Sequence, residues 1–359
     1  MFEINFDGLI GPTHNYSGLS EGNNASKKNF SSPSNPKNAA LQGIKKAETL
    51  IASGLKQGFF LPHERPFIPG LKKLGFNGTN EEILSSAYNY SKVLLSNFSS
   101  ASSMWAANAA TISPSPDTQD GKVHLTPANL NTMFHRSIET EFTYQQCKII
   151  FPKEFFEIHI PAFTISGYGD EGAANHLRIS KSHNEKGFEI FVYGESGFKI
   201  DRTSVKRQAL EVSKSVAFNH KLDMESTFFL QQNHEAVAEG SFHNDIVSLS
   251  NENIFIAHEK AFQNKDDLNE MLKILESKID NFQYIEISDS EIPLKDIINS
   301  YLINSQLITN GDNEMQLILP EEVKGYENCM SWLDKLKQIS DIKLFDFVDI
   351  RQSMMNGGG

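Results

Sequence analysis

Residues 246–287 read IVSLSNENIFIAHEKAFQNKDDLNEMLKILESKIDNFQYIEI, and this stretch decides the fold class. Two short apolar runs, 246–249 and 253–257, are separated by three polar residues, which predicts two strands joined by a tight turn. A helix is predicted from 265 to 279, and a third strand at 283–287. This order of strand, strand, helix and strand differs from the simple βαβ order of a doubly wound sheet.

Strands and helices alternate along the rest of the chain as well, which predicts an α/β fold. The other predicted elements are strands at 2–6, 188–193, 315–319 and 342–348, and helices near 80–97, 204–218, 292–306 and 321–337. One more helix is predicted to begin at Pro36, with Asn35 as its N-cap. Its predicted apolar stripe consists of Ala40, Ile44, Ala47 and Ile51. No linker or sharp shift of composition interrupts the chain, so residues 1–359 are predicted to form a single multi-module domain.

The composition is ordinary for a globular protein, with 39% hydrophobic and 22% charged residues among 359. The net charge of −12 repels nucleic acid and anionic membrane surfaces, which argues against both as partners. The first residues lack the pattern of a secretory signal, and the apolar runs are shorter than the ~20 residues of a membrane span. Cys147 and Cys329 are too few and too far apart for a disulfide scaffold or a zinc cluster. A cytoplasmic location is therefore expected.

Three polar clusters in the first half of the chain are candidate ligand contacts. Residues 17–26 are rich in Gly, Asn and Ser, and either wrap a ligand with backbone N–H groups or form a surface loop. Asn108 lies in an apolar stretch, where its amide needs hydrogen-bond partners that are either substrate or structural. His135 and Arg136 follow an apolar run, and this arginine either holds a carboxylate in bidentate fashion or is a solvated side chain with a buried stem.

Two further clusters contain acids. Asp170 and Glu171 lie between glycines, and adjacent acids in such a turn indicate a cation rather than a phosphate as the ligand. His243 and Asp245 are two residues apart, so on an extended chain they would face the same side. A histidine beside a carboxylate suits acid/base chemistry, although a structural pair is the alternative. Arg207 is a second candidate cation for the site.

The sequence contains no H-E-x-x-H zinc-binding motif. Its one G-x-S-x-G string, residues 18–22, lies inside the Gly/Asn/Ser-rich run 17–26 and not between a predicted strand and a predicted helix, as a nucleophile elbow would. The clusters therefore describe a polar site with paired acids, a candidate base and two arginines, but with no obvious nucleophile.

Long strings of this sequence resemble a known superfamily. They are NFDGLIGPTHNYSGLS, PHERPFIP, SSASSMWAANAATISPS, GKVHLTPANLN, FHRS, GDEGAANH, FVYG, FHNDIVSLSN, YLINSQL and MMNGGG. On these strings the chain resembles, over essentially its whole length, the guanidine-modifying (pentein) superfamily, and within it the enzymes that act on N2-succinylarginine. The resemblance implies an α/β propeller of five pseudo-symmetric ββαβ modules, with the active site on the pseudo-fivefold axis. It further implies a homodimer.

The resemblance also implies an activity. N2-succinylarginine and two waters would give N2-succinylornithine, two ammonia and carbon dioxide in arginine catabolism, with no cofactor and no metal. A thiolate would attack the guanidinium carbon, Glu171 would hold the guanidinium N–H groups, and His243 would move protons. Glu171 and His243 match the two acid/base catalytic positions of the family. The positions that match its substrate-binding residues are Ser17, Gly18, Leu19, Ser20, Glu21, Gly22, Asn23, Asn24, Ala25, Ser26, Asn108, His135, Arg136, Arg207, Asp245 and Asn356.

The sequence departs from the family pattern at one place. In the family the Asn-Gly-Gly-Gly motif, which begins here at Asn356, continues with Pro-Ala-Cys, and that cysteine is the nucleophile. Here the last residue is Gly359, and neither Cys147 nor Cys329 lies in such a context. The domain is therefore expected to be C-terminally truncated relative to the family, with its last module incomplete and no activity of its own. Two alternatives stay open, namely a deiminase that releases one ammonia from free arginine, and a non-catalytic binder of acylated arginine.

Overall fold

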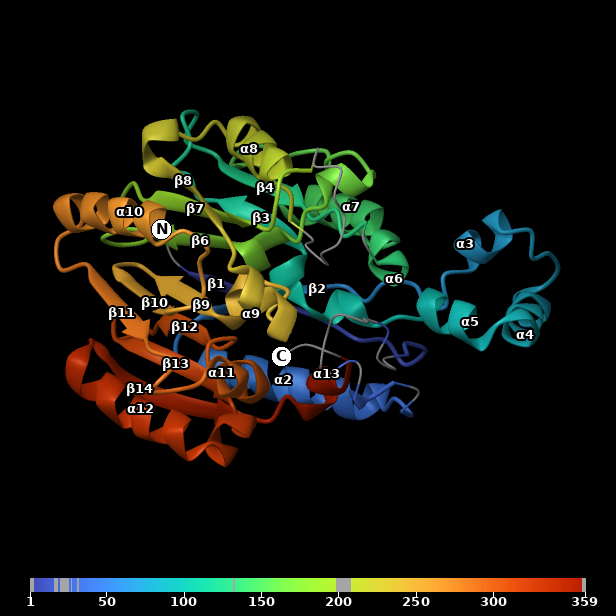
Figure 1. Cartoon of the computed structure of the whole chain (residues 1–359). Coiled ribbons are helices and arrows are strands. Elements are labelled where there is room, and N and C mark those ends of the chain that lie inside the picture. The colour runs from blue at the N-terminus through green and yellow to red at the C-terminus, as the bar shows by residue number, and fades with distance from the viewer. Residues whose placement is uncertain are drawn as a thin grey trace.

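The computed structural model of the chain describes most of its residues. The described ranges are 3–15, 19, 26, 28–30, 32–131, 133–197 and 208–356. They contain four three-stranded sheets and one two-stranded sheet, with helices between and around them (Figure 1). Within these ranges, none of the helices combines the length and the apolar character that a membrane crossing requires.

The four three-stranded sheets share one topology. In each sheet the first two strands pair antiparallel, and the third strand pairs parallel with the second. In chain order the strands are β3 (Ala110–Ser113), β4 (Val123–Pro127) and β5 (Phe156–Ile158); β6 (His176–Ile179), β7 (Phe188–Tyr193) and β8 (Thr227–Gln231); β9 (Ser248–Asn251), β10 (Ile254–His258) and β11 (Gln283–Ile287); and β12 (Gln306–Thr309), β13 (Met315–Pro320) and β14 (Ile342–Val348). The helices that precede the third strands are α7 (Thr140–Ile150), α8 (Leu210–Asn219), α10 (Lys265–Lys278) and α12 (Glu327–Ile339). The chain thus repeats a ββαβ unit four times.

The unit formed by β9, β10, α10 and β11 confirms the order predicted from its sequence. Every residue of β10 is buried, because this central strand is covered on both faces. Asn264 caps α10, since its side chain accepts a hydrogen bond from the backbone N–H of Asp266 at 2.9 Å. The buried face of α10 consists of Leu268, Met271, Leu272 and Leu275. Local patterning therefore specifies this unit well.

The remaining sheet contains the parallel strands β1 (Ile4–Gly8) and β2 (Lys56–Phe60), connected through α2 (Pro36–Ala52). Among the described residues, no strand pairs with the other edge of β1. This sheet therefore has the helix and the parallel pair of the repeated unit, without the antiparallel strand that the other four sheets possess.

The predicted start of α2 is confirmed, because the Asn35 side chain accepts a hydrogen bond from the backbone N–H of Asn38 at 3.1 Å. The predicted apolar stripe of α2 is wrong in part. Ala47 is buried, but Ile44 and Ile51 are 44% and 54% exposed. The face that packs against the sheet is rotated instead toward Ala47 and Leu50. The sequence pattern did not distinguish the two faces, because apolar residues lie on both.

The predicted helix near 80–97 is two helices, α4 (Asn80–Tyr90) and α5 (Lys92–Phe98). Ser91 has extended backbone, ends α4, and caps α5 by accepting a hydrogen bond from the N–H of Leu94. Together with α3 (Ile68–Lys73), these helices project from one side of the molecule (Figure 1) and enclose a small apolar cluster of their own. This extension lies outside the sheets.

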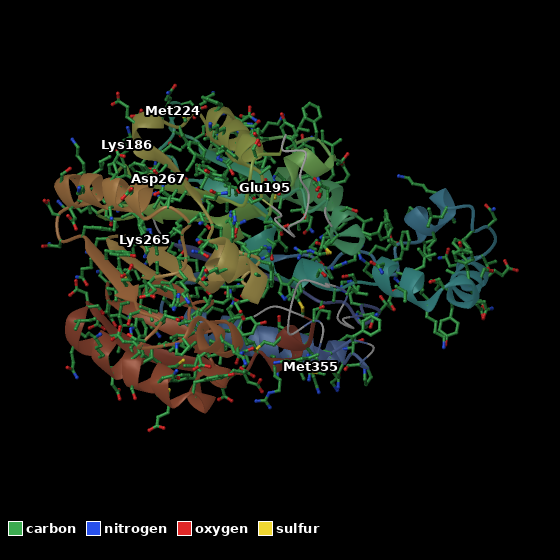
Figure 2. All side chains as sticks on the ribbon, in the orientation of Figure 1. Lys186, Glu195, Met224, Lys265, Asp267 and Met355 are labelled. Atoms are coloured by element: carbon green, nitrogen blue, oxygen red, sulfur yellow. The ribbon has the colours of Figure 1, made fainter. Side chains whose placement is uncertain are left out.

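The first strands of neighbouring units lie side by side near the centre, because β9 contacts both β6 and β12. The helices α10 and α12 lie on the outer side of their sheets (Figure 1). Figure 2 shows the exposed residues Lys265 and Asp267 of α10 on this outer surface, whereas Met355 of α13 (Arg351–Asn356) lies below the centre of the view. Segments that lead into the inner strands therefore converge on the middle of the molecule.

Candidate active site

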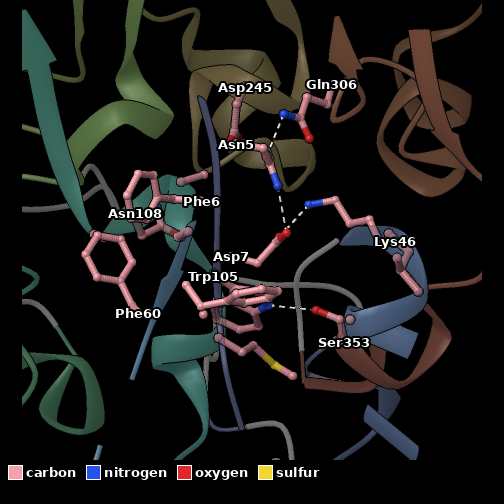
Figure 3. Close-up of a pocket in the computed structure, with 18 of the residues that line it drawn as sticks. Asn5, Phe6, Asp7, Lys46, Phe60, Trp105, Asn108, Asp245, Gln306 and Ser353 are labelled. Atoms are coloured by element: carbon pink, nitrogen blue, oxygen red, sulfur yellow. Dashed lines mark hydrogen bonds and ion pairs between the residues drawn. The ribbon is translucent and has the colours of Figure 1, made fainter. Parts of the chain in front are cut away.

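A cavity of about 770 Å³ lies where these segments converge. Asn108 precedes β3, Arg136 lies in the short helix α6 (Phe134–Ser137), and His243 and Asp245 precede β9. All four of these predicted site residues line the cavity, although three different parts of the chain supply them. The labelled Asn108 and Asp245 are visible in Figure 3. A concave site with a few convergent polar groups is the usual form of a small-molecule site.

Glu171 and His243 are in direct contact. The Nε2 atom of His243 lies 2.7 Å from Oε2 of Glu171, and the two residues are 5% and 2% exposed. His243 lines the cavity, whereas Glu171 is not among its lining residues. A carboxylate in this position orients an imidazole and stabilises its protonated form. The pair can therefore take up and release a proton at the cavity wall.

The backbone of Glu171 is held on two sides. Its N–H donates to Oε1 of Gln208 at 2.6 Å, and its carbonyl accepts from Nδ2 of Asn108 at 3.2 Å. Gly172 has a φ of +67°, and a Cβ there would lie 3.1 Å from Cβ of Ala128. Glycine is thus required where the chain turns to bring Glu171 to His243.

Asp170 has a supporting position rather than a place in the cavity wall. Its Oδ1 accepts hydrogen bonds from the N–H of Gly172 and from Nε2 of Gln208, both at 3.1 Å. Burial raises the pKa of this carboxyl to about 6. Of the two adjacent acids, Glu171 is therefore the one placed for chemistry.

Asp245 reaches the cavity in a different way from the predicted one. His243 and Asp245 do not lie on one extended strand, because residues Asn244–Ile246 form a 3-10 turn before β9 begins at Ser248. Both side chains nevertheless line the same cavity. Burial raises the pKa of the Asp245 carboxyl to about 6, and the negative charge of Glu171 acts in the same direction. A cation in the cavity would favour the ionised form of Asp245.

Asn108 and Arg136 occupy neighbouring positions on the wall. Asn108 ends a 3-10 helix, Ala106–Asn108, and is 7% exposed. Arg136 is 4% exposed, donates from Nε to Oε2 of Glu139 at 3.0 Å, and has its Cζ 5.2 Å from the ring centroid of Trp105. His135 is buried too, but it does not line this cavity.

Several predicted substrate-binding residues fall outside what the structure describes. They are Ser17, Gly18, Ser20, Glu21, Gly22, Asn23, Asn24, Ala25 and Arg207. Leu19 and Ser26 are described, and neither lines the cavity, although Ser26 is fully buried. Asn356 ends α13, and its side chain is outside the described part of the chain. These roles stay predictions.

Comparison with known proteins agrees with this geometry. The family model described as succinylarginine dihydrolase (AstB) matches residues 1–359. The chain belongs to the succinylarginine dihydrolase family. It is 45% identical over 366 residues to the N-succinylarginine dihydrolase of Hahella chejuensis (strain KCTC 2396), a match that covers 100% of this chain and 81% of the relative. It is 46% identical over 363 residues to that of Aliivibrio fischeri (strain ATCC 700601 / ES114), which covers 99% of this chain and 81% of the relative.

Solved structures confirm the predicted α/β fold class. ArgZ, an arginine dihydrolase from the ornithine-ammonia cycle in cyanobacteria, superposes with a TM-score of 0.59 at 14% identity, covering 98% of this chain and 39% of that one. DDAH from Pseudomonas aeruginosa in complex with citrulline gives a TM-score of 0.54 at 13% identity, covering 100% of this chain and 96% of that one. This member of the succinylarginine dihydrolase family thus has an α/β fold that matches pentein enzymes.

Sequence reasoning missed a second polar group in the cavity of this family member. Nδ2 of Asn5 donates to Oδ2 of Asp7 at 2.7 Å, and Nζ of Lys46 pairs with Oδ1 of the same carboxylate at 2.7 Å (Figure 3). Gln306 donates to Oδ1 of Asn5 at 2.8 Å. Polar residues at alternate positions of an otherwise apolar N-terminal strand were the signal that could have revealed Asn5 and Asp7.

The two cysteines lie away from the cavity. Cys147 on α7 and Cys329 on α12 are both fully buried, and neither lines the cavity. Burial raises the pKa of Cys147 to about 12 and raises that of Cys329 as well. A thiol that stays protonated and has no access to the cavity is a poor nucleophile. Both cysteines are free, in agreement with the prediction that they form no disulfide scaffold.

Proposed function

We propose that this protein hydrolyses N2-succinylarginine at its guanidinium carbon, as the names of its relatives indicate for them. With two waters the products would be N2-succinylornithine, two ammonia and carbon dioxide. The observation that supports this proposal most directly is the 2.7 Å contact between His243 and Glu171, because it supplies an acid/base pair at the wall of a cavity. Such a reaction would be a step of arginine catabolism.

Asp245 is the carboxylate that we assign to the guanidinium. It is buried and lines the cavity, and its Oδ1 has no hydrogen-bond partner among the described residues. A guanidinium offers planar pairs of N–H donors, which match a carboxylate in geometry and in charge. This assignment adds Asp245 to the expectation that carboxylates such as Glu171 hold the substrate cation, and Glu171 also contacts His243.

His243 is the group that we assign to proton transfer. The guanidinium nitrogen must gain a proton to leave as ammonia, and the attacking water must lose one. His243 can perform both transfers, because it lines the cavity and its Nε2 is hydrogen-bonded to the Glu171 carboxylate. The same cycle on the resulting ureido group would release the second ammonia.

The implied chemistry requires a thiolate, which would form a covalent amidino intermediate with the guanidinium carbon. Cys147 and Cys329 do not reach the cavity. Ile350 and Ser353 line the cavity around the start of α13. A cysteine shortly after Asn356, as in the family's Asn-Gly-Gly-Gly-Pro-Ala-Cys pattern, would therefore follow a helix that already borders the site.

The same proposal extends to the fold. The parallel pair β1 and β2 with α2 corresponds to the second half of the repeated ββαβ unit. We infer that these elements belong to a fifth unit of the same kind. The arrangement would then be the five-module propeller expected from the resemblance. A homodimer and a cytoplasmic location stay predictions, and the two free cysteines suit a reducing compartment.

Product analysis tests this function against its alternatives. Protein that carries the family's continuation after Gly359 should release two ammonia and one carbon dioxide for each N2-succinylornithine formed. One ammonia per substrate, with a ureido product, would instead support the deiminase alternative. The same longer protein addresses the binding alternative, because a binder would take up N2-succinylarginine in calorimetry without forming any product.

A further inference from the structure

A buried cluster of charges lies directly behind the cavity wall. Arg65, Arg136 and Glu139 are 6%, 4% and 5% exposed, and Arg136 belongs both to the wall of the main cavity and to that of a small cavity of about 20 Å³. Glu139 lines the small cavity. Arg136 therefore separates the ligand space from the buried carboxylate of Glu139.

Glu139 holds one edge of the Arg136 guanidinium. Nε of Arg136 donates to Oε2 of Glu139 at 3.0 Å, and within the described residues the other two guanidinium nitrogens have no hydrogen-bond partner. The side chains of this pair are 5% and 6% exposed, so the contact is protected from solvent. An arginine bound through Nε presents its Nη edge in the opposite direction, and that edge matches a carboxylate.

Trp105 holds the flat face of the same guanidinium. Its ring centroid is 5.2 Å from Cζ of Arg136, which is the range of a cation–π contact. Nε1 of Trp105 donates to Oγ of Ser353 at 3.0 Å (Figure 3), and this bond links the ring to α13. The guanidinium is therefore fixed in its plane by Glu139 and across its face by Trp105.

The cluster has an excess of positive charge. Glu139 is the buried carboxylate that acts on both arginines. Arg65 makes its hydrogen bonds to neutral acceptors, namely the carbonyls of Ser100 and Glu64 and the Nδ1 atom of His63. Burial lowers the pKa of His63 to about 3, so this histidine adds no charge at neutral pH. The exposed carboxylate of Glu64 is screened by water.

We propose that Glu139, assisted by Trp105, is the positioning residue of Arg136. A ligand carboxylate on the Nη edge of Arg136 then balances the positive charge that remains because Arg65 and Arg136 share the single carboxylate of Glu139. The proposal rests on the proposed function, because N2-succinylarginine brings carboxylates into this cavity. It goes further by assigning orientation to Glu139, which does not line the main cavity, and to Trp105, which lines it beside Arg136. An imprecisely placed guanidinium would still be positive, but it would lose the bidentate geometry that gives selectivity.

A double-mutant cycle tests whether Glu139 acts through Arg136. Glu139→Asp keeps the charge but is one methylene too short to reach Nε in its present position. We expect it to weaken binding of N2-succinylarginine on the order of tenfold by calorimetry, and to have almost no further effect in an Arg136→Met background. Glu141→Asp on the same helix is the matched control, because Glu141 is exposed and should leave the affinity unchanged.

The ligand supplies a second readout. N2-acetylarginine lacks the succinyl carboxylate, and N-succinylagmatine lacks the α-carboxylate. The loss of affinity caused by Glu139→Asp should disappear for whichever of these two ligands lacks the carboxylate that Arg136 holds. If Glu139→Asp does not fold, Trp105→Leu removes the ring face and should show the same dependence on Arg136.

The possible results separate the two proposals. The positioning role would be overturned if the losses of binding free energy from Glu139→Asp and Arg136→Met were additive. It would also be overturned if Glu139→Asp reduced the affinity equally for all three ligands, and either result would leave the proposed function intact. Selective binding with the expected cycle, but no ammonia from protein carrying the family's continuation, would overturn the proposed reaction and leave the positioning role intact. Unsubstituted protein that binds none of the three ligands would overturn both.

Discussion

The imidazole of His243 contacts the carboxylate of Glu171, with 2.7 Å between Nε2 and Oε2 across 72 positions of sequence. His243 lines the cavity, whereas Glu171 does not. Glu171 is therefore the hydrogen-bond partner of the histidine, and Asp245 is an acid that lines the cavity itself, as Asp7 also does.

Replacing Glu171 by Gln should slow catalysis in protein that carries the family's continuation. The imidazolium of His243 would lose a charged partner in a buried site, and such a loss costs about 2–4 kcal/mol of transition-state stabilisation. We expect kcat to fall on the order of 100-fold, while circular dichroism and the melting temperature stay close to those of the parent. Glu185→Gln, at an exposed site, is the control. A rate within about threefold of the parent would assign Glu171 to structure alone.

The affinity for N2-succinylarginine should depend on pH through Asp245. Burial raises the pKa of this carboxyl to about 6, and only the ionised form attracts a guanidinium. Affinity should therefore weaken as the pH is lowered from 7 through 6, as measured by calorimetry. Asp245→Asn should bind weakly at every pH and lose this dependence, whereas the exposed control Asp312→Asn should keep it. An unchanged pH profile in Asp245→Asn would assign the titration to another group.

Stability should decrease as the pH falls below about 6.5, the ordinary pKa of histidine. Burial lowers the pKa of His220 far below that value, with smaller decreases for His14, His159 and His258, and His63 reaches about 3. When a folded-state pKa is lowered, the unfolded chain binds more protons between the two pKa values. The folded state is therefore favoured above pH 6.5 and loses stability progressively below it.

His220 offers a direct test of this dependence. Its two ring nitrogens are hydrogen-bonded to Thr126 and Ser113, each at 2.8 Å, and its ring stacks on His159. His220→Gln should lower the melting temperature at pH 7 but reduce its decline between pH 7 and pH 5. His234→Gln, at an exposed position, should leave that decline unchanged. An undiminished decline in His220→Gln would mean that His220 does not contribute to it.

The 359-residue protein by itself should bind N2-succinylarginine and release no ammonia. Attack on the guanidinium carbon requires a nucleophile within roughly 3–3.5 Å, and neither Cys147 nor Cys329 lines the cavity. The measurement is ammonia release beside that of protein carrying the family's continuation. Turnover by the 359 residues alone would contradict the assignment of a thiol after Asn356. Turnover of the longer protein that is lost on Cys→Ser substitution within the continuation would support it.

The repeated units could be predicted because their signals are local. The strands at 188–193 and 283–287 were predicted with their observed bounds, since alternation of β-branched and aromatic residues specifies a strand without knowledge of its neighbours. The cap at Asn35 likewise depends on a contact only three residues away. Where local signals conflicted, prediction failed. The stripe containing Ile44 and Ile51 was placed on the wrong face of α2, because periodicity shows that a face is apolar and not what covers it.

The site residues that matched motifs were named from sequence, but their relations were decided by tertiary structure. No pattern within the chain indicates that Glu171 meets His243, or that Trp105 bonds to Ser353 across 248 positions. Such contacts depend on how separate units pack around a centre, and packing is a long-range property that residue types and spacing do not encode in any local window. The sequence by itself determined the elements and the chemical inventory. The tertiary structure decided that Asp245 lines the cavity, that Glu171 contacts His243, and that neither cysteine lines the cavity.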